Sequence, residues 1–185
     1  VGDTGIEYGT ISAEKNSQQI EITTFRSDVY DGQSRNPEVK FGDTLEGDLI
    51  RRDFSVNAMA VEITGDGSMV FHDPMGGLTD LAAQRLDTPN TPELSFHDDP
   101  LRMLRAARFV SQLGFEVAPR VEEAMRDMAG EITRITAERV QAELDKLMLG
   151  AAPWTGINLM VTTGIADYIF PEIPGMKLTQ DEHMQ

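Results

Sequence analysis

The 185-residue sequence contains no cysteine, which excludes disulfide bonds, catalytic thiolates and zinc sites built on thiolates. No apolar run approaches the roughly 18–20 residues that a helix needs to span a bilayer. The first residues also lack the basic region and the apolar core of a signal peptide. We therefore expect a cytoplasmic protein that does not associate with a membrane.

Basic residues are few: 16 Lys and Arg stand against 31 Asp and Glu, and the formal net charge is −15. Broad, non-specific binding of nucleic acid relies on many Lys and Arg contacts to phosphate, so this charge argues against it. A focused basic site remains compatible with the sequence. The composition, 40% apolar and 25% charged, is typical of a folded globular chain.

The first 87 residues combine strand patterns with short helices. Alternating, β-branched segments at 6–13 and 19–26 predict two strands, and the polar span 27–43 predicts a loop. Thr44 is a suitable N-cap for a short helix that carries Leu45, Leu49 and Ile50.

The next segment predicts a hairpin, because residues 54–63 alternate and meet 69–72 across Gly65-Asp66-Gly67. We read Asp73-Pro74-Met75-Gly76-Gly77 as a structural turn, since it lacks the spacing of a P-loop, and expect a short helix at 78–84.

After residue 87 the pattern becomes helical. Helices are predicted at residues 99–113, 119–130, 136–149 and 153–163. The sequence thus predicts an α+β protein, with a small mixed unit over 1–87 followed by a helical unit over 88–185.

The most informative stretch is 97–109, where three arginines at three-residue spacing follow two carboxylates. Residues three apart are neighbours on a helix, so Asp99, Arg102 and Arg105 can serve one ligand, with Arg108 next in line. Guanidinium groups suit phosphates and a carboxylate suits an amino group, and a nucleotide carries both. The alternative is a solvated helix face whose acids favour the helix dipole.

A second stretch, residues 51–60, places Arg, Asp and Asn before small and apolar residues. Arg52 could hold a triphosphate, with Asp53 and Asn57 available for ribose hydroxyls or phosphate oxygens. The alternative is a surface Arg–Asp pair worth at most ~1 kcal/mol.

Two further charged positions remain open. Glu21 lies between Ile20 and Ile22, so it could face a polar cleft if the isoleucines face the core, or it could be an ordinary exposed carboxylate. Glu138 and Arg139 most simply belong to a solvated helix face, although either could brace a neighbouring site.

Together these stretches resemble the bacterial class II tRNA nucleotidyltransferases, the CCA-adding enzymes, with poly(A) polymerases as close relatives. The motifs that carry the resemblance follow the family's order and lie at residues 51–60, 73–81, 98–109 and 134–144. It implies a truncated nucleotidyltransferase palm with a mixed or antiparallel sheet over 1–87 and an all-helical neck over 88–185. The implied activity is the addition of CCA to the tRNA 3′ end from CTP and ATP, with no nucleic-acid template.

The resemblance also implies roles for single residues. Arg52, Asp53 and Asn57 would hold the triphosphate and sugar, and Arg105 and Arg108 would bind phosphate or support their helix. Asp99 and Arg102 would read the base, because cytosine and adenine each present an amino donor beside a ring-nitrogen acceptor. Guanine and uracil place a carbonyl where the amino group should be, which leaves the carboxylate facing an acceptor.

The same resemblance implies that the activity requires magnesium. Family members hold two Mg²⁺ ions with an Asp-x-Asp pair, which would precede residue 1, and the sequence contains no such pair. Residues 19–26 resemble the strand that brings a third acidic residue, so Glu21 becomes the catalytic candidate. The resemblance therefore implies an N- and C-terminally truncated fragment, and because one carboxylate cannot organise two metals, we expect it to be inactive alone.

Two alternatives stay open. One is a poly(A) polymerase or a partial CC- or A-adding enzyme, which the nucleotides incorporated into tRNA would distinguish. The other is a non-catalytic nucleotide- or RNA-binding module that has lost its metal site, which would account for the missing Asp-x-Asp pair.

Overall fold

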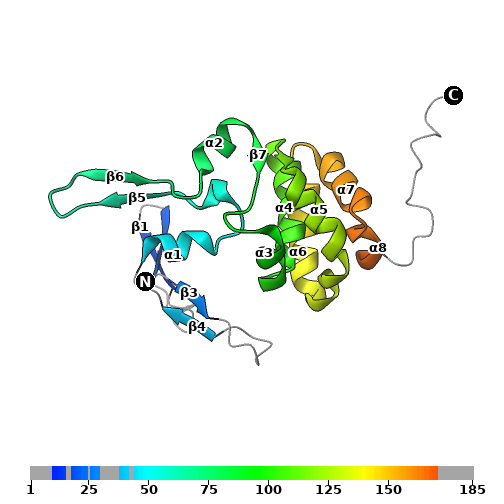
Figure 1. The fold of residues 1–185 in the computed structure, drawn as a ribbon, viewed down its shortest axis with the longest axis horizontal. Helices are drawn as coiled ribbons and strands as arrows, with labels where there is room; N and C mark the ends of the chain where they lie inside the picture. The colour runs from blue at the N-terminus through cyan, green and yellow to red at the C-terminus, as the bar shows by residue number, and fades with distance from the viewer. Residues whose placement is uncertain (1–9, 16–17, 25, 30–37, 42–43, 171–185) are drawn as a thin grey trace. The chain divides into compact units, whose positions relative to one another are not determined.

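The computed structural model describes residues 10–15, 18–24, 26–29, 38–41 and 44–170 (Figure 1). Contacts along the chain divide it into two compact units, Val1–Arg51 and Arg52–Gln185. Helices and strands both occur, which confirms the predicted α+β class. Within the described residues the strands form two-stranded sheets, three of them antiparallel and one parallel.

In the first unit, β1 (Thr10–Lys15) pairs antiparallel with β2 (Gln18–Thr23), and Ser12 lies opposite Glu21. The two predicted strands are therefore confirmed where the chain is described. Residues 6–9 lie outside the described part.

The predicted loop over 27–43 is partly wrong. β3 (Arg26–Val29) and β4 (Glu38–Phe41) form an antiparallel pair at its two ends, while residues 30–37 lie outside the described part. Polar composition indicates a loop only weakly, because pairing with a partner strand can override the local preference of a segment.

The short helix α1 (Leu45–Ile50) begins as predicted at Thr44, whose hydroxyl accepts a hydrogen bond from the Gly47 amide at 3.2 Å. Leu49 is almost fully buried. Asp48 is buried as well and lies 4.0 Å from the Arg51 guanidinium. The helix is thus held by its cap and by one apolar face.

The second unit begins with a 3-10 turn, η2 (Ser55–Asn57), where the sequence predicted a strand. The prediction is wrong here because the neighbouring residues Phe54 and Ser55 are both fully buried, whereas successive side chains of an alternating strand would point to opposite faces. Ser55 donates from its hydroxyl to Asp80 at 2.6 Å and from its amide to the Asp87 carbonyl at 2.8 Å. These bonds anchor η2 to the segments that follow it.

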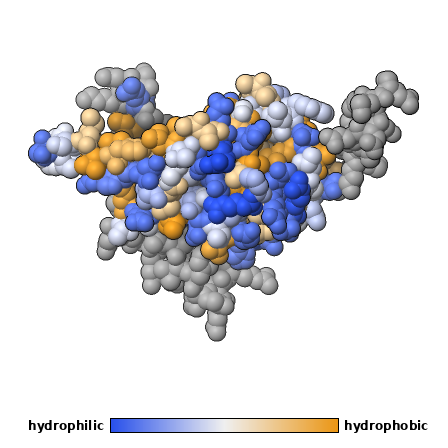
Figure 2. Space-filling model, turned by 45° about the horizontal axis from the view of Figure 1, so that its top comes forward, coloured by the Kyte–Doolittle hydropathy of each residue, from blue (hydrophilic) through white to orange (hydrophobic). Residues whose placement is uncertain are grey.

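The predicted hairpin is confirmed as β5 (Ala60–Ile63) and β6 (Met69–His72). Val61 pairs with Phe71, and Ile63 with Met69, and each of these four side chains exposes more than half of its surface. Figure 2 shows the resulting hydrophobic surface along the hairpin.

Asp73 forms the predicted structural turn. Its two carboxylate oxygens accept the amides of Gly77 at 2.6 Å and Leu78 at 3.0 Å, at the start of α2 (Gly77–Ala82). Gly76 has φ of +70°, a conformation that favours glycine.

The rest of the unit is largely helical. Its elements are β7 (Arg85–Leu86), α3 (Pro92–Asp98), α4 (Leu101–Leu113), β8 (Glu116–Val117), α5 (Pro119–Met128), η3 (Ala129–Arg134), α6 (Ala137–Met148), α7 (Pro153–Thr162) and α8 (Ile165–Ile169). The four predicted helices are confirmed, while α3 and α8 were not predicted. Among the described residues, no helix is long and apolar enough to cross a membrane.

The core of this unit is centred on α4. Met103, Leu104, Ala106 and Ala107 of α4 are almost fully inaccessible to solvent, and α4 packs against α6 and α7. Gly156 of α7 permits a close approach, because a Cβ atom there would lie 2.6 Å from the Ala107 carbonyl oxygen. The arginine helix is therefore the central support of the helical part (Figure 1).

Candidate functional site

Asp53 joins the 51–60 stretch to the arginine helix. Its side chain is only 6% exposed, and one carboxylate oxygen accepts from the Phe54 amide at 2.7 Å and from the Asn57 side chain at 3.1 Å. The other oxygen lies 2.7 Å from the Arg105 guanidinium of α4. Three predicted site residues are thus brought together, with Arg52 exposed beside them.

Asp99 lies in the turn between α3 and α4, where its backbone is extended with φ of −143° and ψ of 98°. One carboxylate oxygen accepts the Leu101 amide at 3.1 Å, and the other accepts from Arg139 of α6 at 3.0 Å. The predicted base-reading carboxylate is therefore held by its own helix and by a second one.

Arg102 is the first of the three partly buried arginines of α4, and it is held by a contact with α3. Its guanidinium donates to the hydroxyl of Ser95, a buried residue of α3, at 3.0 Å. Of the two residues predicted to read a base, Asp99 thus lies just before α4 and Arg102 lies in its first turn, and each is restrained by a neighbouring helix.

Arg108 has a different environment, since its side chain is only 11% exposed. It donates to the buried carboxylate of Glu143 on α6 and to Gln112 at 3.1 Å, and its guanidinium lies 4.3 Å from the ring centre of Phe109. Arg108 therefore supports the helix packing, and its role in binding phosphate stays a prediction.

Glu21 belongs to the first unit, where its side chain on β2 is exposed. Ile20 and Ile22 beside it are 54% and 55% exposed, so neither provides the core face that alternation suggested. Across the residues that the structure describes, no three His, Cys, Asp or Glu side chains are grouped so as to hold a metal ion. The catalytic role of Glu21 stays a prediction.

Arg139 and Ser95 support the residues predicted to read the base. The sequence suggested Arg139 as a possible brace, and it contacts Asp99. Ser95 was missed, because a single serine in a short helix carries no pattern that would distinguish it. Its role emerges only where α3 packs beside α4.

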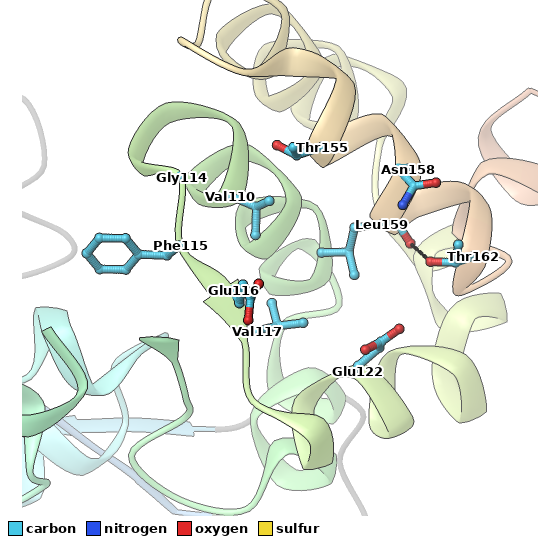
Figure 3. Close-up of a pocket in the computed structure, with 10 residues that line it drawn as sticks. All are labelled: Val110, Gly114, Phe115, Glu116, Val117, Glu122, Thr155, Asn158, Leu159 and Thr162. Carbon is cyan, nitrogen blue, oxygen red and sulfur yellow. Dashed lines mark hydrogen bonds between the residues drawn. The ribbon is translucent and has the colours of Figure 1, made fainter. Parts of the chain in front are cut away.

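A separate hollow of about 380 Å³ lies where β8 meets α4, α5 and α7 (Figure 3). Val110 and Leu159 point into it, and polar groups at its edge include Glu116, Glu122 and Asn158. None of the predicted nucleotide-binding residues lines this hollow. Its lining comes from four elements, so the sequence alone could not indicate it.

Two family models match the chain. One, described as the poly A polymerase head domain, matches residues 1–87. The other, described as a probable RNA- and SrmB-binding site of polymerase A, matches residues 114–176.

Curated relatives are named CCA-adding enzymes. That of Levilactobacillus brevis is 41% identical over 167 residues, which cover 90% of this chain and 41% of the relative. That of Bacillus pumilus is 37% identical over 176 residues, or 95% of this chain and 42% of the relative. The chain thus spans less than half the length of these relatives.

Solved structures give the same result. The Bacillus stearothermophilus CCA-adding enzyme in complex with CTP has a TM-score of 0.79 and 35% identity, covering 94% of this chain and 40% of that one. The Thermotoga maritima CCA-adding enzyme complexed with tRNA has a TM-score of 0.71 and 28% identity, covering 92% and 37%.

Proposed function

The chain belongs to the family of poly(A) polymerases and CCA-adding enzymes, and from this premise we propose that it serves the template-independent addition of C, C and A to the 3′ end of tRNA from CTP and ATP. The observation that carries the proposal is the 2.7 Å contact between Asp53 and Arg105. It places the 51–60 stretch directly beside α4, which bears Arg102 and follows the turn that contains Asp99. This contact supports the proposal that the two separately predicted stretches serve one nucleotide.

Base selection follows from the chemistry of Asp99 and Arg102. The carboxylate accepts a hydrogen bond from the amino group of cytosine or adenine, and the guanidinium donates to the adjacent ring nitrogen. Uracil and guanine present a carbonyl and a ring N–H at these positions, so that like groups face each other. Such a mismatch leaves polar groups unpaired and rejects the wrong base.

Triphosphate and sugar binding are assigned to the neighbouring groups. Arg52 and Asp53 precede η2, Asn57 at the end of η2 donates to Asp53, and the Arg105 side chain is 35% exposed beside Asp53. A triphosphate can draw on Arg52 and Arg105 through charge-assisted hydrogen bonds. In this assignment Asp53 orients Arg105 as well as contacting the sugar.

Magnesium does not fit the described residues by themselves. A polymerase-type metal site needs several carboxylates, and the described residues offer Glu21 without two further ligands grouped beside it. Since the sequence also has no Asp-x-Asp pair, we propose that this chain alone binds nucleotides without transferring them, and that transfer by the complete site uses Mg²⁺.

A poly(A) polymerase is the second candidate, because both family models are described by polymerase A. The protein expressed from its complete gene should be incubated with tRNA lacking its last three nucleotides and with labelled CTP, ATP or both. We expect C incorporation from CTP alone and a terminal A only when CTP is also present. Long A tails from ATP alone would identify a poly(A) polymerase, and no incorporation would identify a binding module.

The site assignment is tested by measuring the dissociation constants of CTP, ATP, GTP and UTP for this chain. Asp99→Ala should reduce the preference for CTP over UTP by about 5- to 150-fold, because one paired base contact contributes about 1–3 kcal/mol. Arg52→Gln should weaken all four nucleotides alike. Asp127→Ala, which removes an exposed carboxylate of α5, is the matched control. Unchanged discrimination in Asp99→Ala would refute the assignment.

A further inference from the structure

The contact between Asp99 and Arg139 ties the proposed base-reading carboxylate to a helix that lies 40 positions further along the chain. The guanidinium of Arg139 on α6 donates a hydrogen bond to the Asp99 carboxylate at 3.0 Å. The Arg139 side chain is half exposed, and that of Asp99 is 29% exposed. A half-exposed ion pair contributes little to folding stability. Its position beside the proposed base-reading group therefore points to a role in nucleotide binding and not in folding.

The carboxylate is held by two contacts on different oxygens. The Leu101 amide binds one oxygen and Arg139 binds the other. The terminal torsion of an aspartate is broad, so a single contact would leave the group able to turn. Contacts at both oxygens restrict that rotation. A carboxylate has about four lone-pair sites, so acceptor capacity remains for the amino group of a base.

A fixed carboxylate is what rejection of the wrong base requires. When the carbonyl of uracil or guanine faces Asp99, a mobile side chain can turn away and relieve the repulsion. A restrained one cannot, and the unfavourable contact persists. Discrimination thus depends on rigidity as well as on the presence of the carboxylate.

From this geometry we propose that Arg139 is a positioning residue for base selection, which holds Asp99 against rotation and so enforces rejection of UTP and GTP. The inference rests on the proposed function, in which Asp99 reads the base. Arg139 acts through Asp99 and makes no contact with the nucleotide. Replacing Arg139 should therefore change the preference among nucleotides, whereas loss of a purely structural ion pair would not.

The test is Arg139→Gln in this chain, with dissociation constants measured for the four nucleoside triphosphates. We expect the preference for CTP over UTP to fall about fivefold, mainly because UTP and GTP bind more tightly. Arg139→Lys should restore part of the preference, since the ammonium keeps the charge but not the planar fork. The melting temperature should stay close to that of the unsubstituted chain.

The matched control is Arg126→Gln. Arg126 of α5 is 52% exposed and pairs with Glu122 at 2.6 Å, and it therefore loses a comparable surface ion pair without any contact to Asp99. We expect it to leave the nucleotide preference unchanged. A similar loss of preference in this variant would overturn the inference.

Two comparisons separate the possible failures. If the unsubstituted chain does not prefer CTP and ATP over UTP and GTP, the proposed function itself fails. If it does, but Arg139→Gln leaves the preference intact, only the positioning role fails. In an Asp99→Ala background Arg139→Gln should have no further effect, and a further loss there would show that Arg139 contacts the nucleotide directly.

Discussion

The arginines of α4 differ in how much of each side chain remains exposed to a ligand. Arg105 and Arg108 each contact a carboxylate, but their side chains are 35% and 11% exposed. Arg105 can reach a ligand without leaving its place beside Asp53. Arg108 is enclosed by Glu143, Gln112 and Phe109 and contributes mainly to the packing of α4 on α6.

This difference predicts that Arg108→Gln costs stability. The substitution leaves the buried Glu143 carboxylate without its cation, which should lower the free energy of unfolding by about 3 kcal/mol. Urea unfolding followed by circular dichroism measures it. Arg126→Gln, at an exposed pair, should cost less than about 1 kcal/mol. An unchanged urea midpoint together with a large loss of triphosphate affinity would instead place Arg108 in the binding site.

At the scale of elements, η2 and α2 pack so closely that only glycine fits between them. A Cβ atom on Gly77 would lie 2.2 Å from the backbone oxygen of Ser55 and 2.8 Å from the Met59 side chain. The backbone of η2 positions Asp53 and Asn57. The contact of α2 with η2 is therefore part of the support of the candidate site.

Gly77→Ala should consequently weaken both folding and nucleotide binding. Overpacking against backbone should cost about 1–3 kcal/mol in the free energy of unfolding, and the shift of η2 should lower affinity for all four nucleotides. Chemical denaturation and nucleotide titration are the two measurements. Gly65→Ala is the control, because a Cβ atom there meets no atom within 4 Å. Equal effects of the two substitutions would contradict the packing argument.

The turn of the β5–β6 hairpin contains a carboxylate with a shifted pKa. Hydrogen bonds from the Thr64 hydroxyl and then from Ser68 lower the pKa of Asp66 from 3.8 to about 2. Because the folded value is the lower one, the stabilisation is fully present above about pH 4 and is lost as the pH falls towards 2. The hairpin turn should therefore loosen only in strong acid.

Nuclear magnetic resonance of the Asp66 carboxyl carbon tests this expectation. Its titration midpoint should lie near 2, and Thr64→Val should move it upwards by removing the largest cause of the shift. Asp66→Asn should remove the acid dependence of the Ser68 amide shift. A midpoint at the ordinary value of 3.8 would contradict the hydrogen-bond arrangement.

At the scale of the whole molecule, the net charge of −15 opposes contact with polyanions except where arginines gather. Arg52 and the arginines of α4 supply that local exception. The chain as a whole therefore lacks the electrostatic attraction that drives indiscriminate binding to nucleic acid.

This charge predicts that random-sequence duplex DNA binds more weakly than about 10⁻⁴ M at 0.15 M salt, outside the usual range of non-specific binders. Fluorescence anisotropy of a labelled duplex measures the affinity, with a lysine-rich protein of similar size as the positive control. Micromolar binding that falls steeply with salt would show a basic surface that the charge balance does not indicate.

The predictable part of the fold is the part encoded locally. The helices α4, α5, α6 and α7 each run for ten residues or more, so the apolar period is visible in the sequence. The helices α3 and α8 span seven and five residues, which are too few to show that period. The β3–β4 pair was not predicted, because strand pairing depends on a partner that local composition does not reveal.

The candidate site divides in the same way. The sequence by itself determined the family, the α+β class and the spacing that places Arg102 and Arg105 on one helix shortly after Asp99, because each depends on residues close together in the chain. Only the tertiary structure decided which groups meet them: Arg139 is 40 positions from Asp99, and Glu143 is 35 from Arg108. Contacts over such separations depend on how α3, α4 and α6 pack, and side-chain spacing within one helix carries no information about the neighbour it will face.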